Sequence, residues 1–387
     1  MLSGCWPGRQ PSQFFARRSD TPGGEAVRIV FRADANLQIG TGHLMRCLTL
    51  ADRVRECGAE CIFFCRASGL GVLEHRIKAA GHSVMTWVDP QQSRDFAPRN
   101  EVCHAWLPGG WESDVQACLD RLAGARPEWL VVDHYGIDWR WEETMRREAG
   151  RLLVIDDVAD RKHACDLLLD QNLVPGMSSR YDGLLPAGAR TLLGPRYALL
   201  RPEFANPGRV RRTAAVQPRL LVMYGGADRQ ELTLRTVRIL ADIKWSGGAD
   251  VVVGPLYANS DALREPVKGI ENAVLRAPAW NIAELMAVAD LALGSPGATS
   301  WERCACALPA VTISQAENQE AIGVGLQEAG AHCYLGRAES VTDEEIAAAL
   351  MRLANDPHAL AEMSLRASGI TDGSGAERVA QLMMELK

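Results

Sequence analysis

The chain of 387 residues is long enough to form two ordinary domains, each with its own core. A hydrophobic content of 47% and a charged content of 23% are typical of a globular protein and exclude a disordered chain. The formal net charge of -6, without a long basic block, argues against nucleic acid as the main partner, and no apolar run is long enough for a membrane span.

Residues 1–26 contain no continuous apolar segment of the kind that a secretory signal needs, and we expect an extension without fixed structure. Val27 begins the first predicted strand. One hypothesis is therefore that an internal GTG codon at this position is the true start of translation. The eleven cysteines are then expected to be reduced thiols of a cytoplasmic protein. No paired Cys-x-x-Cys or His-x-x-x-His spacing accompanies them, so we predict no metal site.

Strand-like and helix-like segments alternate from residue 27 to the end of the chain, which predicts an α/β protein with parallel sheets covered by helices. A helix is predicted over 43–57 because apolar residues form one stripe along it, at Leu44, Leu48, Ala51 and Val54. The predicted strands of the first half cover residues 27–31, 60–65, 83–87, 129–133, 152–156 and 167–170.

The pattern restarts after a connector at 206–218 that contains Pro, Gly and Arg and has little periodicity. The predicted strands that follow cover residues 219–224, 250–253, 273–276, 291–294 and 310–313. We therefore expect one domain over 27–205 and a second over 219–387, with the last helix at 376–386 free to pack back on the first. A ligand would lie in the cleft between them, at the carboxyl ends of the strands.

The glycine-rich segment 38–47 joins the first predicted strand to the first helix. Gly40 and Gly42 let the backbone turn sharply and approach a ligand closely. His43 falls in the first helical turn, beside backbone N–H groups that no helix carbonyl satisfies. The positive end of the helix dipole favours the neutral imidazole, which can accept a proton. His43 is therefore a candidate general base, and a capping or packing histidine is the alternative.

A second strand-to-helix turn lies at residues 291–302. Free backbone N–H groups at a helix start near Thr299 suit phosphate, and Ser295 and Ser300 add hydroxyl donors. Glu302, one turn into the helix, is better placed to accept hydrogen bonds from ribose hydroxyls. Structural capping by Thr299 and Glu302 is the alternative. The chain has no Gly-x-x-x-x-Gly-Lys-Ser/Thr segment, which excludes a Walker-type ATP site.

Three shorter turns also follow predicted strands. Gly225-Gly226 faces the cleft from the second half, although a glycine pair alone is weak evidence. Asp133 opens a polar turn at the same sheet edge as His43, and a turn-forming role is an equal alternative for it. Asp156-Asp157 could hold a divalent cation, but we expect a solvated turn.

One half thus offers a base and the other a cradle for a diphosphate, which is the layout expected for an enzyme acting on a nucleotide sugar. A nucleoside diphosphate is a good leaving group and departs without an enzyme acid. Glycosidases, in contrast, need two carboxylates because their leaving alcohol is poor. One histidine that activates water is therefore sufficient for hydrolysis.

Several segments occur in the order found in one known family: Arg32-x-Asp34, Gln38-Ile-Gly-x-Gly-His43-x-x-Arg46, Asp133-His134-Tyr135-Gly136, Gly225-Gly226-x-Asp228, Gly297-Ala298-Thr299-Ser300-Trp301-Glu302-Arg303 and Glu317-Asn318-Gln319. From about Val27 to its end the chain resembles the PseG family, the UDP-2,4-diacetamido-2,4,6-trideoxy-beta-L-altropyranose hydrolases of pseudaminic acid biosynthesis. Its second half also resembles the MurG glycosyltransferases. The resemblance implies the GT-B fold, in which two Rossmann-like α/β domains enclose a cleft.

The resemblance further implies a hydrolysis without metal or cofactor that breaks the anomeric C–O bond with inversion and releases UDP and the free sugar. His43 corresponds to the base that activates water, and residues 297–302 correspond to the site for diphosphate and ribose. The contacts implied for the UDP-sugar are Arg32, Asp34, Gly40, Gly42, Asp133, Tyr135, Asn172, Arg201, Gly225, Gly226, Ser295, Gly297, Ala298, Thr299, Ser300, Glu302, Asn318 and Gln319.

Two other functions remain open on the sequence. A glycosyltransferase of the same fold would pass the sugar to an acceptor other than water, but the loop at 89–100 is polar and mixed in charge, unlike a membrane-binding surface. A binding module without catalysis would have no use for His43. The sugar could also be a related hexose such as the legionaminic acid precursor. A hinged enzyme of two domains is expected to be a monomer.

Overall fold

The computed structural model describes residues 27–386 except for 37–38, 69, 89–105, 108, 206, 208–217, 227, 229, 255, 278 and 280. The expectations for residues 1–26, for the loop at 89–100 and for most of the connector at 206–218 therefore lie outside the described residues. No helix within the described ranges is long and apolar enough to cross a membrane.

The first half of the chain builds a seven-stranded parallel sheet of order β3-β2-β1-β4-β5-β6-β7. Its strands are β1 (Arg28–Ala33), β2 (Glu60–Arg66), β3 (Ser83–Trp87), β4 (Trp129–Asp133), β5 (Arg151–Ile155), β6 (Leu167–Asp170) and β7 (Arg190–Leu193). Its helices are α1 (Gly42–Glu56), α2 (Gly71–Ala79), α4 (Gly110–Leu122) and α5 (Trp139–Met145). Short 3-10 turns occur at Arg146–Glu148, Met177–Ser179, Pro195–Tyr197 and Pro202–Phe204.

The second half builds a six-stranded parallel sheet of order β10-β9-β8-β11-β12-β13. Its strands are β8 (Leu220–Met223), β9 (Ala249–Val252), β10 (Ala273–Arg276), β11 (Leu291–Gly294), β12 (Ala310–Ser314) and β13 (His332–Arg337). The helices that follow are α6 (Leu232–Asp242), α7 (Arg264–Lys268), α8 (Ile282–Val288), α9 (Thr299–Ala305), α10 (Glu320–Glu328), α11 (Asp343–Ala354), α12 (Pro357–Ser368) and α13 (Gly375–Glu385). Further 3-10 turns lie at Ser260–Leu263 and Glu317–Gln319.

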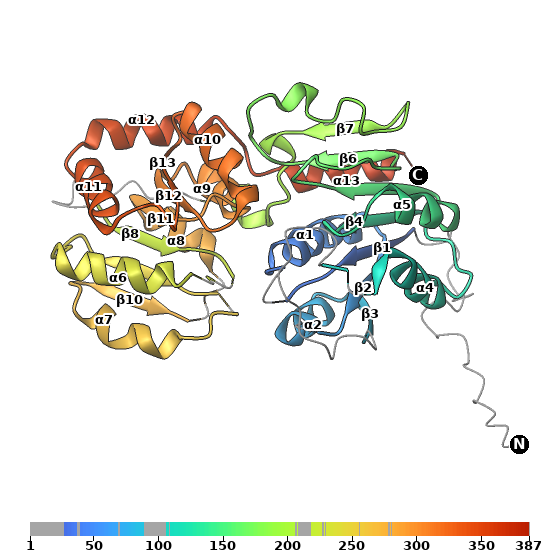
Figure 1. Cartoon of the computed structure of the whole chain (residues 1–387), viewed down its shortest axis with the longest axis horizontal. Helices are drawn as coiled ribbons and strands as arrows, with labels where there is room; N and C mark the ends of the chain where they lie inside the picture. The colour runs from blue at the N-terminus through green and yellow to red at the C-terminus, as the bar shows by residue number, and fades with distance from the viewer. Residues whose placement is uncertain are drawn as a thin grey trace, which may run out of the picture.

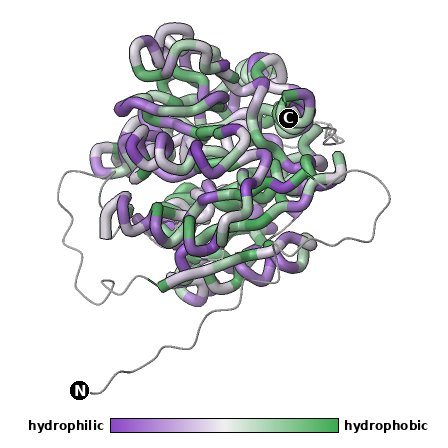
Figure 2. The backbone as a smooth tube through the Cα atoms, turned by 90° about the vertical axis from the view of Figure 1, so that its right-hand side faces the viewer, coloured by the Kyte–Doolittle hydropathy of each residue, from purple (hydrophilic) through white to green (hydrophobic). Residues whose placement is uncertain are grey.

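Each strand expected from the sequence is present, with ends shifted by at most two residues. The prediction missed β7 and β13, which are edge strands of their sheets. Arg190 and Thr191 in β7 and Gly336 and Arg337 in β13 interrupt the continuous apolar run that marks a buried parallel strand. Buried apolar side chains cover both faces of each sheet, and hydrophobic and hydrophilic residues alternate along the covering helices (Figure 2).

Both sheets contain a point at which the strand order reverses. In the first sheet β1 lies between β2 and β4, and in the second β8 lies between β9 and β11. The loops that leave the two strands on either side of such a point diverge, and the crevice between them is where ligands bind in open α/β sheets. The loops after β1, β4, β8 and β11 are those that carry His43, Asp133, Gly225-Gly226 and Ser295.

The last helix, α13, leaves the second half and packs on the first sheet beside α1 (Figure 1). The Trp129 indole donates a 3.0 Å hydrogen bond to the Met383 carbonyl, and Val379 is fully buried in the same core. The chain returns at Gly373, whose φ of +77° favours glycine. A Cβ there would lie 2.2 Å from the Phe204 carbonyl oxygen, so the two crossings between the halves lie side by side.

A cluster of buried charges fixes the loop after β5. His163 Nδ1 lies 2.7 Å from Glu142 Oε1, and its Nε2 lies 3.8 Å from Asp156 Oδ2. Burial opposes a charge on this imidazole, but the two carboxylates outweigh it and raise the pKa of His163 to about 9. His163 is therefore a buried cation at neutral pH.

Replacing Val379 by Asp should destabilise the first half, because it puts an unpaired carboxylate into a core that α13 completes. We expect the free energy of unfolding to fall by roughly 3 kcal/mol or more in urea titrations. Gln381→Asp, on the exposed face of the same helix, is the control and should change it by less than about 1 kcal/mol. Equal effects of the two substitutions would show that α13 does not complete this core.

Stability should also fall as the pH rises from 6.5 to 9. In this range the folded protein keeps the His163 proton that the unfolded chain, with a pKa near 6.5, has lost. The contribution is complete below pH 6.5 and amounts to roughly 3 kcal/mol, at about 1.4 kcal/mol for each pH unit. The measurement compares urea unfolding at several pH values in wild type, His163→Gln and the exposed control His358→Gln. The slope should flatten in His163→Gln alone.

Candidate active site

His43 and Asp133 meet at the reversal point of the first sheet. Asp133 ends β4, which pairs with β1 in register at Ala33, and His43 lies at the start of α1. His43 Nδ1 lies 2.6 Å from Asp133 Oδ1. Burial would raise the pKa of Asp133, but Arg46 and His43 hold it well below its usual value. The ionised carboxylate can only accept, so Nδ1 carries the hydrogen, and Nε2 is the nitrogen that can act as an acceptor in the neutral imidazole.

Arg46 is the residue that keeps Asp133 ionised, and it was not among the side chains expected to contribute to the site. Its Nε and Nη2 donate to the two Asp133 oxygens at 2.6 and 2.7 Å. The same guanidinium reaches Asp157, with Nη1 2.9 Å from Oδ1 and Nη2 2.7 Å from Oδ2. Its position one helical turn after His43, on the same face, is the signal that could have identified it.

Asp157 also forms hydrogen bonds with two other polar side chains. It accepts hydrogen bonds from the Tyr135 hydroxyl at 2.6 Å and from Asn172 Nδ2 at 2.7 Å. Asn318, from the second half, donates to the Tyr135 hydroxyl at 3.3 Å. The Tyr135 ring meets the His43 imidazole edge to face at 4.7 Å between centroids, and it stacks on Trp106. Tyr135, Asn172 and Asn318, predicted separately, therefore lie together around His43.

The expectation of a solvated turn at Asp156-Asp157 is wrong. Asp156 is fully buried and Asp157 is 9% exposed. Asp156 pairs with Arg161 at 3.1 Å, and Asp157 pairs with Arg46, so these cations take the place of water. Among the residues that the structure describes, no group of three or more His, Cys, Asp or Glu side chains is arranged to hold a metal ion.

Arg32 and Asp34 do not offer free groups to the cleft, contrary to expectation. Both side chains are buried, and Arg32 donates to Asp114 at 2.7 and 3.0 Å and to Asp34 at 2.8 Å. Asp34 also accepts from the Arg66 backbone N–H at 2.8 Å. These ion pairs tie β1 to β2 and α4. Asp133 is likewise fully buried and can act on a substrate only through His43.

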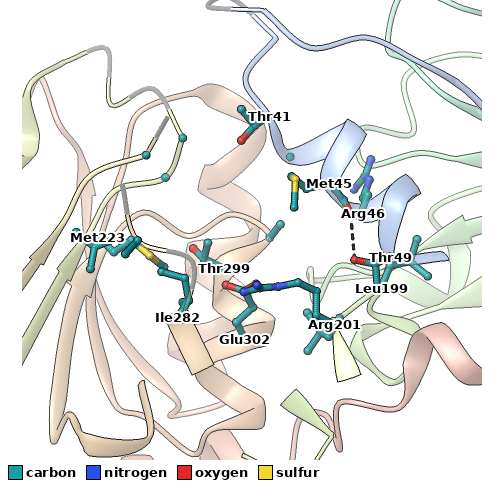
Figure 3. A pocket seen from close by; sticks show the side chains of 18 of the residues that line it. Thr41, Met45, Arg46, Thr49, Leu199, Arg201, Met223, Ile282, Thr299 and Glu302 are labelled. Atoms are coloured by element: carbon teal, nitrogen blue, oxygen red, sulfur yellow. Dashed lines mark hydrogen bonds and ion pairs between the residues drawn. The ribbon is translucent and has the colours of Figure 1, made fainter. Parts of the chain in front are cut away.

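A cavity lies between the two halves (Figure 3). Met45 and Arg201 line it from the first half, and Met223, Thr299 and Glu302 line it from the second (Figure 3). Of the predicted contacts, those in its wall are Gly42, Arg201, Gly225, Gly226, Ala298, Thr299 and Glu302.

His43 itself is not in the wall of this cavity, although its neighbour Gly42 is. Thr41 and Gly226, which both line the cavity, are in contact across the two halves. A Cβ on Gly226 would lie 2.4 Å from the Thr41 hydroxyl oxygen. Gly226 is therefore required for the close approach of the two halves. Gly40, with a φ of +80°, shapes the turn that precedes Thr41 and has no side chain to offer.

Glu302 and Arg201 face one another across the cavity. Arg201 Nη2 lies 3.8 Å from Glu302 Oε1, and both side chains are about one-sixth exposed, at 18% and 17%. Burial raises the pKa of Glu302, and the positive charge of Arg201 opposes that shift. A carboxylate in this position can accept hydrogen bonds from hydroxyl groups of a ligand.

Gln315 connects the loops that follow β8, β11 and β12 in the second half. It was not among the residues expected at the site. Gln315 Nε2 donates to Ser295 Oγ at 2.9 Å and to the Tyr224 carbonyl at 3.0 Å. Its backbone N–H donates to Gln319 Oε1 at 2.8 Å. Gln319 lies beside Gly297, where a Cβ would be 3.7 Å from its Nε2. Ser295, Gly297 and Gln319 are thus brought together.

Ser300 is fully buried and its hydroxyl accepts a 2.8 Å hydrogen bond from Arg303. The expectation that it contacts the substrate is not supported by this geometry, because Ser300 is absent from the cavity wall and its hydroxyl has an internal partner. The helix α9 begins at Thr299, as expected, but has only seven residues.

No known protein-family profile matches the chain. It is 25% identical over 304 residues to the UDP-2,4-diacetamido-2,4,6-trideoxy-beta-L-altropyranose hydrolase of Campylobacter jejuni, covering 79% of this chain and 97% of that protein. It is 24% identical over 303 residues to an uncharacterised protein of Methanocaldococcus jannaschii, covering 76% of this chain but only 57% of that one.

Among solved structures, MurG of Acinetobacter baumannii superimposes with a TM-score of 0.61 at 14% identity, over 93% of this chain and 99% of that one. This likeness and the two parallel sheets confirm the predicted GT-B fold with two Rossmann-like halves. The resemblance to the PseG hydrolases is confirmed by the Campylobacter relative. The chain is therefore a GT-B protein similar over most of its length to a hydrolase of a UDP-linked diacetamido sugar.

Proposed function

We propose that this chain is an enzyme that hydrolyses a UDP-linked 2,4-diacetamido-2,4,6-trideoxy sugar, UDP-2,4-diacetamido-2,4,6-trideoxy-beta-L-altropyranose, in pseudaminic acid biosynthesis. The observation that carries the proposal is the His43–Asp133 pair at 2.6 Å, held at the edge of the cleft between the halves. Asp133 fixes the tautomer in which Nε2 can take a proton. The similarity to the Campylobacter hydrolase supports the choice of substrate.

In the proposed reaction His43 Nε2 accepts a proton from water as the water oxygen attacks the anomeric carbon. The bond between that carbon and the diphosphate oxygen breaks on the opposite face, and UDP leaves with the electron pair. The configuration at the anomeric carbon is therefore inverted. Asp133 stabilises the imidazolium that forms, and Arg46 keeps Asp133 ionised.

The UDP is proposed to occupy the cavity between the halves. Thr299 and the backbone at Gly225 and Ala298 would meet the diphosphate, and Glu302 would accept hydrogen bonds from the ribose. Ser295, Gly297 and Gln319 extend this surface. Tyr135, Asn172 and Asn318 would meet the sugar beside His43. His43 is not in the wall of the cavity, so we propose that the loops at Thr41 and Gly226, which are in contact, move apart for the sugar to reach the base.

The domain limits belong to the same proposal. The first domain would cover 27–205 and the second 219–387, with α13 returned to the first. The enzyme would act as a monomer, because each half contributes its own part of one cleft.

A glycosyltransferase is the second candidate, and the fold shared with MurG favours it. In that case His43 would deprotonate an acceptor hydroxyl instead of water, and the donor site would be unchanged. The two reactions differ only in which nucleophile reaches the anomeric carbon.

The proposal predicts release of UDP and free sugar in equal amounts when the purified protein meets the UDP-linked diacetamido sugar without any acceptor. The release is followed by chromatography, with ¹H NMR of the first sugar anomer formed, and it should continue in EDTA. His43→Asn should lose most of the turnover and still bind UDP. Turnover that starts only after an acceptor is added would favour transfer, and normal turnover in His43→Asn would exclude this base.

Asp133→Asn should lower kcat by roughly 100-fold or more, because a neutral amide in place of the carboxylate can neither fix the tautomer of His43 nor stabilise its imidazolium. The affinity for UDP, measured by calorimetry, should stay within about twofold, since Asp133 does not line the cavity. Asp34→Asn, which also breaks a buried ion pair of the first sheet, is the matched control. It should lower the melting temperature while retaining most of kcat, and equal loss of kcat in both variants would reduce Asp133 to a structural role.

A further inference from the structure

Arg303, on α9, is a buried cation without a carboxylate partner among the described residues. Arg303 is 1% exposed, and no described Asp or Glu forms an ion pair with it; the neighbouring Glu302 pairs with Arg201. Its Nε has no hydrogen-bond partner within the described part of the chain. Burial lowers the pKa of Arg303 to about 10, so the guanidinium remains charged at neutral pH. Burying an uncompensated charge is costly, and a nearby anion would offset that cost.

The guanidinium lies directly behind the loop that follows β11. Nη2 donates to the Ser295 carbonyl at 2.9 Å and to Ser300 Oγ at 2.8 Å, and Nη1 lies 3.3 Å from Thr299 Oγ1. The residue holds this loop at both ends. Gly294 leaves room for it, because a Cβ there would lie 3.1 Å from Nη1.

These bonds also decide which way two hydroxyl groups point. A hydroxyl carries one hydrogen and accepts through its lone pairs. Thr299 Oγ1 accepts from Arg303 and Ser295 Oγ accepts from Gln315, so each keeps its hydrogen for another acceptor. Thr299 lines the cavity between the halves, where Figure 3 shows it close to Glu302.

No described carboxylate forms an ion pair with Arg303, and the charge of Glu302 acts on it only through space. His332, nearby in the core, is neutral because burial and the charge of Arg303 lower its pKa well below the usual value. Glu302, the next residue, is turned to Arg201 across the cavity. The field of Arg303 therefore reaches the cavity through Thr299 and the loop, and an anionic ligand at Thr299 would complete the ion pair.

We propose that Arg303 is a positioning residue for the diphosphate, which shapes the loop 295–299, turns the Thr299 hydroxyl toward the ligand and supplies the balancing positive charge from behind. This inference rests on the proposed binding of UDP in the cavity. The proposed role differs from anion binding by the free N–H groups of a helix start. The helix α9 has only seven residues, and the positive charge comes from the Arg303 side chain.

Calorimetry with UDP and with uridine tests the proposal, since uridine lacks the diphosphate. Arg303→Met should weaken UDP binding roughly tenfold and leave uridine binding within about twofold. Arg303→Lys, which keeps the charge and loses the planar fork, should recover part of the UDP affinity. Arg219→Met removes a cation that pairs with Asp250 before β8, at the opposite end of the strands, and should change neither affinity.

A double-mutant cycle with Thr299→Val shows whether Arg303 acts through that hydroxyl. The losses of UDP affinity in Arg303→Met and Thr299→Val should then not multiply in the double variant. If Arg303→Met does not fold, the lysine variant and its cycle with Thr299→Val carry the same comparison. If Arg303→Met had the same ratio of UDP to uridine affinity as the wild type, the role of Arg303 would be overturned and the proposed function would stand. Failure of the wild type to bind UDP would overturn the proposed function and this inference together.

Discussion

The ion pair between Asp133 and Arg46 is the constraint on which the first half of the site depends. A fully buried carboxylate would take up a proton unless a cation stayed close to it, and Arg46 binds both of its oxygens. Because Asp133 is ionised, it fixes His43 in one tautomer and one orientation. The same guanidinium fixes Asp157, which in turn holds the Tyr135 hydroxyl. One side chain thus orders most of the polar groups around the imidazole.

The buried cations of the two halves have different partners. In the first half the buried cations Arg46 and Arg32 each pair with two carboxylates, Arg46 in the cavity wall and Arg32 inside the protein. Such a hydrogen-bonded network of charges is rigid and suited to holding a side chain in place. In the second half the described surroundings of Arg303 contain hydroxyl and carbonyl oxygens instead. That arrangement is suited to a ligand that brings its own negative charge.

The connections between the halves give the cleft a defined geometry. The chain crosses between the sheets near Phe204 and again at Gly373, and the two crossings lie in contact (Figure 1). The return of α13 to the first sheet ties the end of the chain to its beginning. Contacts at Thr41–Gly226 and Tyr135–Asn318 then bring the facing loops of the two halves together.

The sequence by itself determined eleven of the thirteen described strands and the turns at their ends, because apolar runs and glycine-rich turns are local signals. It also pointed to His43 as a candidate base, since a histidine that follows a glycine-rich turn at a helix start lies beside free backbone N–H groups. Only the tertiary structure decided which side chains Asp133 and Asp157 contact, because these partners are set by strand order and not by sequence spacing. Arg32 and Asp34 illustrate the reverse case: a motif suggested substrate contacts, and burial against Asp114 turned them into internal ion pairs. Whether a polar side chain meets ligand or protein depends on which side of the sheet edge it faces, and that is fixed only when the sheets assemble.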